Sequence, residues 1–218
     1  MSKIKGGSIM LNALQENLSK ILSSTTTIFT LIGVLIIIVA FTKIKKIKFS
    51  TSMITQIGVA LGVSLALSFI KPFNAPYGGS VTLGSMVPII IISYIYGPVV
   101  GVLTGFLRGV LDFIIGPAQI LHPIQILFDY ALPFMAIGLS SLIKNNKLLG
   151  AVFGTSLRFI FHFISGFIFW YTYAPEGMSP LVYSFLYNIS YVFFDGLICV
   201  LILAVLPLER LQRELTRA

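Results

Sequence analysis

The sequence predicts an all-α integral membrane protein, a six-helix transmembrane bundle with an additional N-terminal hydrophobic helix. The 218-residue chain is 56% hydrophobic and only 10% charged, with a mean hydropathy of +0.97. A soluble domain would carry about a quarter charged residues. A helix needs about 20 apolar residues to cross the hydrocarbon core, so six or seven spans fit in this length. The single cysteine, Cys199, lies in an apolar run, which leaves no intramolecular disulfide or cysteine metal cluster.

The N-terminal part is a lead-in to the bundle. Residues 1–22 are polar and weakly amphipathic, and Thr25 to Phe41 is a short apolar stretch that predicts the additional helix. The sequence KIKKIK at 43–48 follows at once, and lysines directly after a hydrophobic segment mark the cytoplasmic side. The chain therefore divides into an N-terminal part, a six-helix membrane domain and a basic cytoplasmic tail: residues 1–48, 49–207 and 208–218.

Six apolar segments make up the predicted bundle. Turn residues and basic clusters separate them, with the outside loop KPFNAPYGGS at 71–80 and the cytoplasmic loop SLIKNNK at 141–147. Lysine and arginine gather at the inner ends under this topology, as the positive-inside rule requires. The predicted spans are Thr51–Ile70, Val81–Tyr96, Val99–Ile115, His122–Ile143, Leu148–Trp170 and Leu181–Leu206.

The first span of the bundle carries two stripes of small residues at four-residue spacing. Small residues at this spacing allow two helices to approach closely in lipid. They indicate either packing within this chain or a docking face for another membrane subunit, and both interpretations stay open. The stripes are Gly58, Gly62 and Ala66, and Ala60, Ser64 and Ser68.

Two ion pairs are expected inside the bundle. Arg108 and Asp112 are four residues apart, which places them on one helix face. Asp195 lies seven residues after Asn188 on the same face, but deeper, where we expect it to pair with Arg158.

Polar residues from three spans define a candidate binding pocket. Asp129, His162 and Asn188 each lie seven or eight residues from the outer end of their predicted spans, roughly 10–12 Å deep. Polar groups in hydrocarbon are costly and favour a functional interpretation. A carboxylate, an imidazole and an amide beneath aromatic side chains suit a flat, cationic, nitrogen-rich molecule. The neighbouring aromatic residues are Tyr130, Trp170 and Tyr183.

Each of these residues also has a purely structural interpretation. Asp129 would then pair with Arg158 or Arg108, and His162 would be a satisfied interhelical histidine. Trp170 and Tyr183 would be interfacial anchors.

Several stretches resemble the thiamine-specific substrate-binding (S) component of energy-coupling-factor (ECF) vitamin transporters. The strongest are HFISGFIFW at 162–170 and YSFLYN at 183–188. HPIQILFDY at 122–130 is a further one, and PYGGS at 76–80 is weaker. The similarity extends from about Thr51 to Leu206.

The resemblance implies a six-helix protein of a prokaryotic cell membrane that binds thiamine from outside with high affinity, without a cofactor. Such components work with a transmembrane coupling subunit and two ATPase subunits. By this likeness the carboxylate and amide address the aminopyrimidine and the cation, while Trp170 and His162 stack on the rings. The loop at 71–80 resembles a gate over the site, and the small-residue helix resembles a contact with the coupling subunit. The implied binding residues are Asp129, Tyr130, His162, Trp170, Tyr183 and Asn188.

Two positions depart from the pattern of the family. Some members carry glutamate where Asp129 stands, and some carry an aromatic residue where this chain has Gly79. The likeness gives no role to the helix before residue 43, and it leaves open whether thiamine phosphates bind.

Other functions are less consistent with the sequence. An embedded enzyme lacks support, since there is neither a close acidic cluster nor an HExxH motif. A stand-alone secondary transporter would normally be larger and show internal repeats. The net charge of +8 sits mainly at helix ends and does not indicate nucleic acid. Without a P-loop motif, energy for active transport must come from a partner.

Overall fold

A computed structural model describes residues 24–44, 46–115 and 120–217 of the chain. Contacts divide the chain into two units, residues 1–38 and 39–218. In the first unit the described residues belong almost entirely to α2 (Thr25–Ile44), which continues into the second unit. The fold and the site below concern the second unit.

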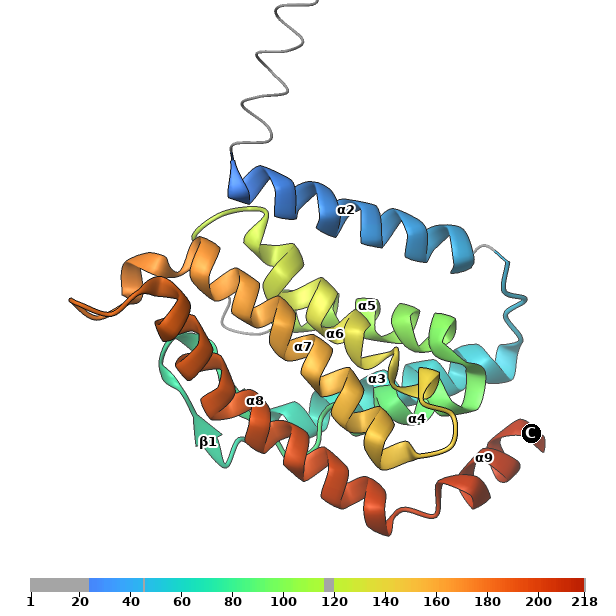
Figure 1. Cartoon of the computed structure of the whole chain (residues 1–218). Coiled ribbons are helices and arrows are strands. Elements are labelled where there is room, and N and C mark those ends of the chain that lie inside the picture. Colours follow the sequence, from blue (N-terminus) through green and yellow to red (C-terminus); the bar gives the residue numbers. More distant parts are fainter. Residues whose placement is uncertain (1–23, 45, 116–119, 218) are drawn as a thin grey trace, which may run out of the picture. The chain divides into compact units, whose positions relative to one another are not determined.

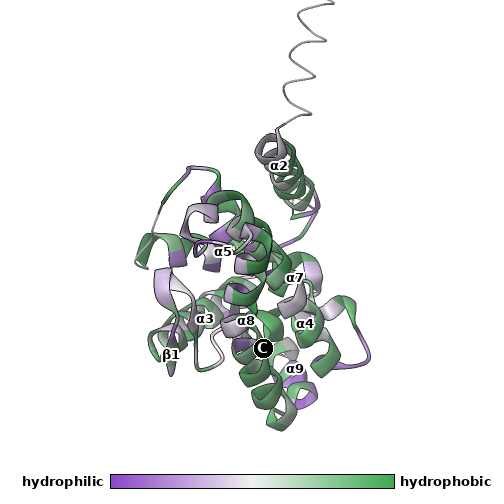
Figure 2. Cartoon of the chain, turned by 60° about the vertical axis from the view of Figure 1, so that its left-hand side comes forward, coloured by the Kyte–Doolittle hydropathy of each residue, from purple (hydrophilic) through white to green (hydrophobic). Residues whose placement is uncertain are grey.

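Within the described ranges, five helices are long and apolar enough to cross a membrane: α2, α3 (Thr51–Phe69), α5 (Pro98–Ile115), α7 (Lys147–Phe169) and α8 (Pro180–Val205). Shorter apolar helical segments supply the two remaining spans of the bundle. These are α4 (Val87–Tyr96), and the series η2 (Leu127–Ala131), α6 (Leu132–Ile137) and η3 (Ser140–Leu142). The amphipathic helix α9 (Leu208–Arg217) ends the described chain. Hydrophobic residues dominate the helices, which confirms an all-α membrane protein (Figure 2).

Side-chain caps explain where the long helices begin. Ser50 Oγ accepts the Met53 N–H at 3.1 Å at the start of α3. Asn146 Oδ1 accepts two N–H groups at 3.0 Å at the start of α7. Ser179 Oγ caps α8, where Pro180 occupies the first turn and needs no N–H partner. These helices therefore begin at or next to the residues that the sequence predicts.

The span predicted from Val81 is helical only from Val87. Its first residue, Val81, instead ends the strand β2 (Ser80–Val81), which pairs in antiparallel fashion with β1 (Phe73–Asn74), and a turn follows. Gly84 then adopts a positive φ of 75°, and Pro88 lies in the first turn of α4. A turn with this backbone cannot continue a helix, so it delays the start of α4.

The span predicted from His122 is also irregular at its outer end. Its helical part begins with the π-helical turn η2, in which the Leu132 N–H bonds to the carbonyl of Leu127. Pro133 follows and has no N–H to offer the carbonyl four residues earlier. The wider turn carries Asp129 and Tyr130, and π-turns are frequent at functional sites.

Glycines bring α5 into backbone contact with the segment η2–α6. A Cβ at Gly105 would clash with the carbonyl oxygen of Phe134, and one at Gly109 with that of Tyr130. Gly101 meets Gly138 in the same way. This close approach is the geometry that small residues permit in a membrane, and it fixes η2 against α5.

The long helices α7 and α8 run side by side, and the β1–β2 hairpin lies along the first half of α8 (Figure 1). The two stripes on α3 face different surroundings. Ser64 and Ser68 are buried, whereas Gly58, Gly62 and Ala66 are exposed. The Ser64 stripe thus packs inside the bundle, and the Gly58 stripe does not.

Candidate functional site

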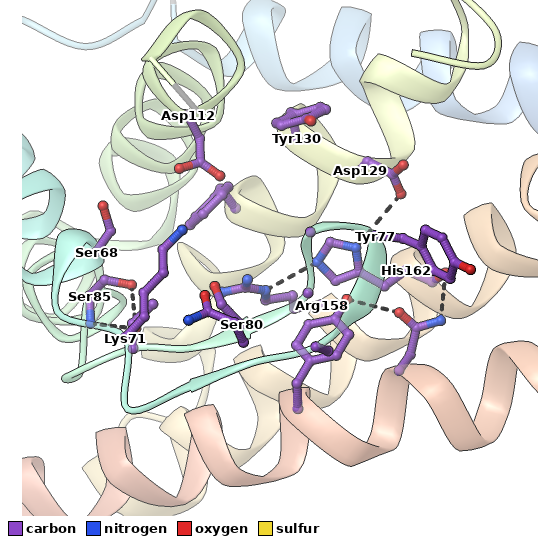
Figure 3. A pocket seen from close by; sticks show the side chains of 18 of the residues that line it. Ser68, Lys71, Tyr77, Ser80, Ser85, Asp112, Asp129, Tyr130, Arg158 and His162 are labelled. Carbon is purple, nitrogen blue, oxygen red and sulfur yellow. Dashed lines mark hydrogen bonds and ion pairs between the residues drawn. The ribbon is translucent and has the colours of Figure 1, made fainter. Parts of the chain in front are cut away.

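A cavity of about 340 Å³ lies among α3, the segment 71–85, α5, η2–α6, α7 and α8. Figure 3 shows residues on both sides of the cavity and between them. Ser68, Lys71, Ser85 and Asp112 lie on one side, Tyr77, Asp129 and His162 lie on the other, and Ser80, Tyr130 and Arg158 lie between them (Figure 3). All six residues singled out from the sequence line it. They are Asp129, Tyr130, His162, Trp170, Tyr183 and Asn188.

Asp129 projects from the π-turn η2 and is held by three neighbours. Its Oδ2 accepts from Gln125 Nε2 at 2.8 Å and from Trp170 Nε1 at 3.1 Å. Its Oδ1 lies 3.8 Å from His162 Nδ1. Asp129 therefore contacts an imidazole and an indole, and the arginine pairing considered from the sequence is not seen among the described residues.

The imidazole of His162 joins the carboxylate of Asp129 to Arg158. Arg158 Nε donates to His162 Nε2 at 3.3 Å. A guanidinium can only donate, so Nε2 is the acceptor and the proton of the neutral ring resides on Nδ1. That proton faces Asp129, and the ring orientation is fixed from both sides.

Arg158 in turn pairs with Asp195, as the sequence predicts. The distance from Nη1 to Oδ2 is 3.5 Å, and the other carboxylate oxygen accepts from the N–H and Oγ1 of Thr82 at 2.8 and 2.7 Å. Polar contacts thus run from Asp129 through α7 and α8 to the turn that follows β2. A buried ion pair with additional hydrogen bonds satisfies charges that would otherwise be costly.

The predicted pair of Arg108 and Asp112 is also confirmed, with 2.9 Å between Nη1 and Oδ1. Arg108 is buried, and its Nε donates to Ser64 Oγ at 2.9 Å. The guanidinium groups of Arg108 and Arg158 lie 4.9 and 4.8 Å from the ring centre of Phe134, within cation–π range. Each arginine therefore contacts a carboxylate and an aromatic face. Among the described residues that line the cavity, Asp129 is the carboxylate that pairs with a histidine and not with an arginine.

The side-chain amide of Asn188 is occupied by the protein. Its Nδ2 donates to the backbone carbonyls of His162 and Ser184 at 3.2 and 2.8 Å, and its Oδ1 accepts from Tyr191 at 2.9 Å. Asn188 is only 3% exposed. In this structure it joins α7 to α8 beside His162, although its amide borders the cavity.

Aromatic rings form the rim of the cavity. The Tyr77 ring lies 4.6 Å from Tyr173 and 6.4 Å from Trp170, measured between centres. Tyr183 stacks on Tyr187 at 5.9 Å. Such faces attract a cation and cover a flat ring.

Several residues in or next to the cavity were not singled out from the sequence as ligand contacts. Gln125 does not line the cavity but donates to Asp129, which lies four residues later, and this spacing could have identified it as a neighbour on one helix face. Tyr187 and Tyr191 follow Tyr183 at four-residue intervals, which is the same signal. Tyr77 reaches the cavity through a loop whose path no periodicity predicts.

Within the described residues the Asp129 carboxylate has no arginine or lysine partner, and a carboxylate of this kind beside aromatic faces is suited to binding an organic cation. No group of three or more histidine, cysteine, aspartate or glutamate side chains that could hold a metal ion occurs within the described residues.

Comparison with known proteins gives a consistent result. Residues 54–215 match the family model of the thiamine transporter protein (Thia_YuaJ). The chain is 35% identical over 149 residues to the thiamine transporter ThiT of Bacillus subtilis, covering 61% of this chain and 77% of the relative. It is 26% identical over 175 residues to ThiT of Lacticaseibacillus paracasei, covering 72% and 84%.

A solved structure agrees with the fold. ThiT from Listeria monocytogenes, 25% identical, superposes with a TM-score of 0.63 over 72% of this chain and 93% of that one. The relatives are named transporters of bacteria, which with the apolar helices indicates a multi-pass protein of a prokaryotic plasma membrane and not an enzyme. The chain therefore belongs to the thiamine transporter protein family.

Proposed function

We propose that this chain captures thiamine in the cavity and serves as the substrate-binding subunit of an ECF-type uptake system. The observation that carries the proposal is Asp129, a cavity carboxylate whose described neighbours are Gln125, Trp170 and His162. A permanent cation with flat rings complements that carboxylate and the aromatic faces beside it. The cavity volume of about 340 Å³ lies in the range usual for sites of small ligands.

The six residues would divide the work of binding among them. Asp129 would face the aminopyrimidine and the cationic ring, while Trp170 and His162 would stack on the rings. Asn188 would hold the backbone of α7 beside His162, through the 3.2 Å bond to its carbonyl. Its Oδ1, which accepts one hydrogen bond from Tyr191, would accept a second from the ligand. Tyr130 and Tyr183 would complete the walls.

The membrane domain, residues 49–207, would hold the site. The family match over 54–215 supports the separation of residues 1–48 from this domain, and it extends into the tail. We assign no function to residues 1–48, and we place the tail 208–218 on the cytoplasmic side.

Transport would draw its energy from partners. The chain carries no P-loop motif, so a coupling subunit and two ATPase subunits would supply the work of ATP hydrolysis. The exposed stripe Gly58, Gly62 and Ala66 on α3 is the surface we propose for the coupling subunit, because small residues allow a partner helix to approach closely.

A titration of the purified protein with thiamine tests the proposal. Trp170 is the only tryptophan in the chain, and its indole N–H bonds to Asp129, so a ligand at that carboxylate should quench its emission. We expect saturable quenching at micromolar thiamine or below. Pyridoxine, a vitamin without a permanent positive charge, serves as the control and should leave the emission unchanged.

Absence of quenching by thiamine would contradict the binding function. Uptake of thiamine into liposomes by the purified chain alone would instead favour a stand-alone secondary transporter.

A further inference from the structure

The segment that covers part of the cavity contains a short turn, residues 76–79. It lies between β1 and β2, and the Ala75 N–H closes it by donating to the Gly79 carbonyl at 2.7 Å. Within it Tyr77 adopts φ 60° and ψ 21°, a left-handed conformation that is costly for a residue other than glycine. Contacts outside the turn must therefore hold it in place.

The hydroxyl of Tyr187, from α8, supplies such contacts. It accepts a hydrogen bond from the Gly79 N–H at 3.1 Å and donates one to the carbonyl oxygen of Pro76. One side chain thus binds both ends of the turn, using its single donor and one acceptor position.

Gly79 is the residue that allows this approach. A Cβ there would lie only 2.8 Å from the Tyr187 hydroxyl and from the ring of Tyr191. Such distances are shorter than real contacts, so a side chain at position 79 and Tyr187 in this position exclude each other. The space that a side chain at position 79 would need is therefore filled by Tyr187 from α8.

The ring of Tyr187 is itself held firmly. It stacks on Tyr183 with 5.9 Å between centres and meets Tyr191 edge-on at 5.6 Å. It also lines the cavity. Contacts with other α8 residues consequently fix the Tyr187 ring, and the hydrogen bonds of its hydroxyl fix the turn relative to α8.

We infer that Tyr187 is a positioning residue that holds turn 76–79 closed over the cavity and thereby sets the rates at which the ligand enters and leaves. The inference rests on the proposed function for its ligand, thiamine. Both hydrogen bonds join groups of the protein, so they stabilise the closed turn whether or not ligand is bound, and the turn must open for entry as well as for release. An interaction that stabilises the closed turn equally with and without ligand slows both steps and leaves the equilibrium affinity unchanged.

The variant Tyr187→Phe removes the two hydrogen bonds and keeps the ring. Stopped-flow measurement of Trp170 emission should show association and dissociation of thiamine both about 10-fold faster, the effect of losing two ordinary hydrogen bonds. The dissociation constant should change by less than about 3-fold, since the two rates change together. Tyr171→Phe is the matched control, because Tyr171 is exposed and is not among the residues that line the cavity. It should leave both rates unchanged.

Two outcomes would overturn the inference. A weaker affinity of Tyr187→Phe without faster association would make Tyr187 a ligand contact or a structural residue, and unchanged rates would remove its role altogether. If the wild-type chain failed to bind thiamine, the proposed function would be wrong. Hydrogen exchange would still test whether the Tyr187 hydroxyl stabilises turn 76–79. The amides of residues 77–79 should exchange about 10-fold faster in Tyr187→Phe than in wild type, and equal rates would refute the role of the hydroxyl.

Discussion

Asp129 shows how a single side chain can be kept ready for a cation. The two buried arginines of the cavity, Arg108 and Arg158, are each paired with another carboxylate, Asp112 and Asp195. From the part of the chain that the structure describes, Asp129 receives only the neutral donors of Gln125 and Trp170 and the imidazole of His162. A positive ligand can therefore approach it without having to displace an arginine.

Replacing Asp129 by asparagine tests this view. The variant Asp129→Asn keeps an oxygen for the indole of Trp170 but removes the charge, so thiamine affinity should fall at least about 30-fold, as when one partner of a desolvated charge pair is lost. Calorimetric titration provides the measurement. Glu176→Gln changes an exposed carboxylate in the segment between α7 and α8, and this control should bind as wild type does. Equal affinity of Asp129→Asn and wild type would show that this carboxylate does not face the cation.

At the level of single residues, the sequence predicted which side chains share the cavity better than what each of them does. The common depth of Asp129, His162 and Asn188 followed from helical rise alone. The partners of Asn188 did not, because they depend on which backbone carbonyls and which tyrosine the packing of α7 against α8 brings within reach.

Among the elements, the packing of α5 against η2–α6 determines where Asp129 is held. Gly101, Gly105 and Gly109 lie four residues apart, the same spacing that the sequence analysis noted on α3. On α5 these glycines contact backbone, whereas Gly58 and Gly62 on α3 have no atom within 4 Å of an added Cβ. Spacing alone cannot separate these two situations, since both produce one face of small residues.

A pair of alanine substitutions distinguishes the two helices. Gly105→Ala would place a Cβ against the carbonyl of Phe134, and overpacking of this kind should lower the stability by about 1–3 kcal/mol. Gly62→Ala adds the same methyl group in open space on α3 and should be neutral or slightly stabilising. Thermal unfolding in detergent measures both. The packing account would fail if the two variants had the same unfolding temperature as wild type.

The boundaries of the elements were predictable where capping chemistry is strong. α3, α5, α7 and α8 begin and end at or next to the predicted residues, because serine, asparagine, proline and glycine mark their ends. The delayed start of α4 and the π-turn η2 were not predicted. Both occur in apolar stretches, and hydropathy does not distinguish a regular helix from an irregular backbone. Both also border the cavity.

For the whole molecule, the exposed stripe on α3 is where a membrane partner can approach. Val59 and Val63 on the same helix are also exposed, but their branched side chains keep a neighbouring helix further away than glycine does. The proposed coupling subunit would therefore contact Gly58, Gly62 and Ala66 directly.

Enlarging one residue of this stripe should uncouple transport from binding. Gly62→Leu should abolish copurification of the coupling and ATPase subunits and thiamine uptake by cells, while the purified variant binds thiamine as tightly as wild type. Val63→Leu, the adjacent exposed position, adds one methylene group beside the stripe and should retain at least half of the uptake. Undiminished uptake by Gly62→Leu would move the docking surface elsewhere.

The central claim, that this cavity holds thiamine, is tested most directly by a crystal structure of the chain with thiamine. We expect the vitamin among α5, η2, α7 and α8, with a ring nitrogen or the amino group within hydrogen-bond distance of Asp129 and one ring against the indole of Trp170. Thiamine bound elsewhere, with Asp129 still contacting only Gln125, Trp170 and His162, would contradict the account.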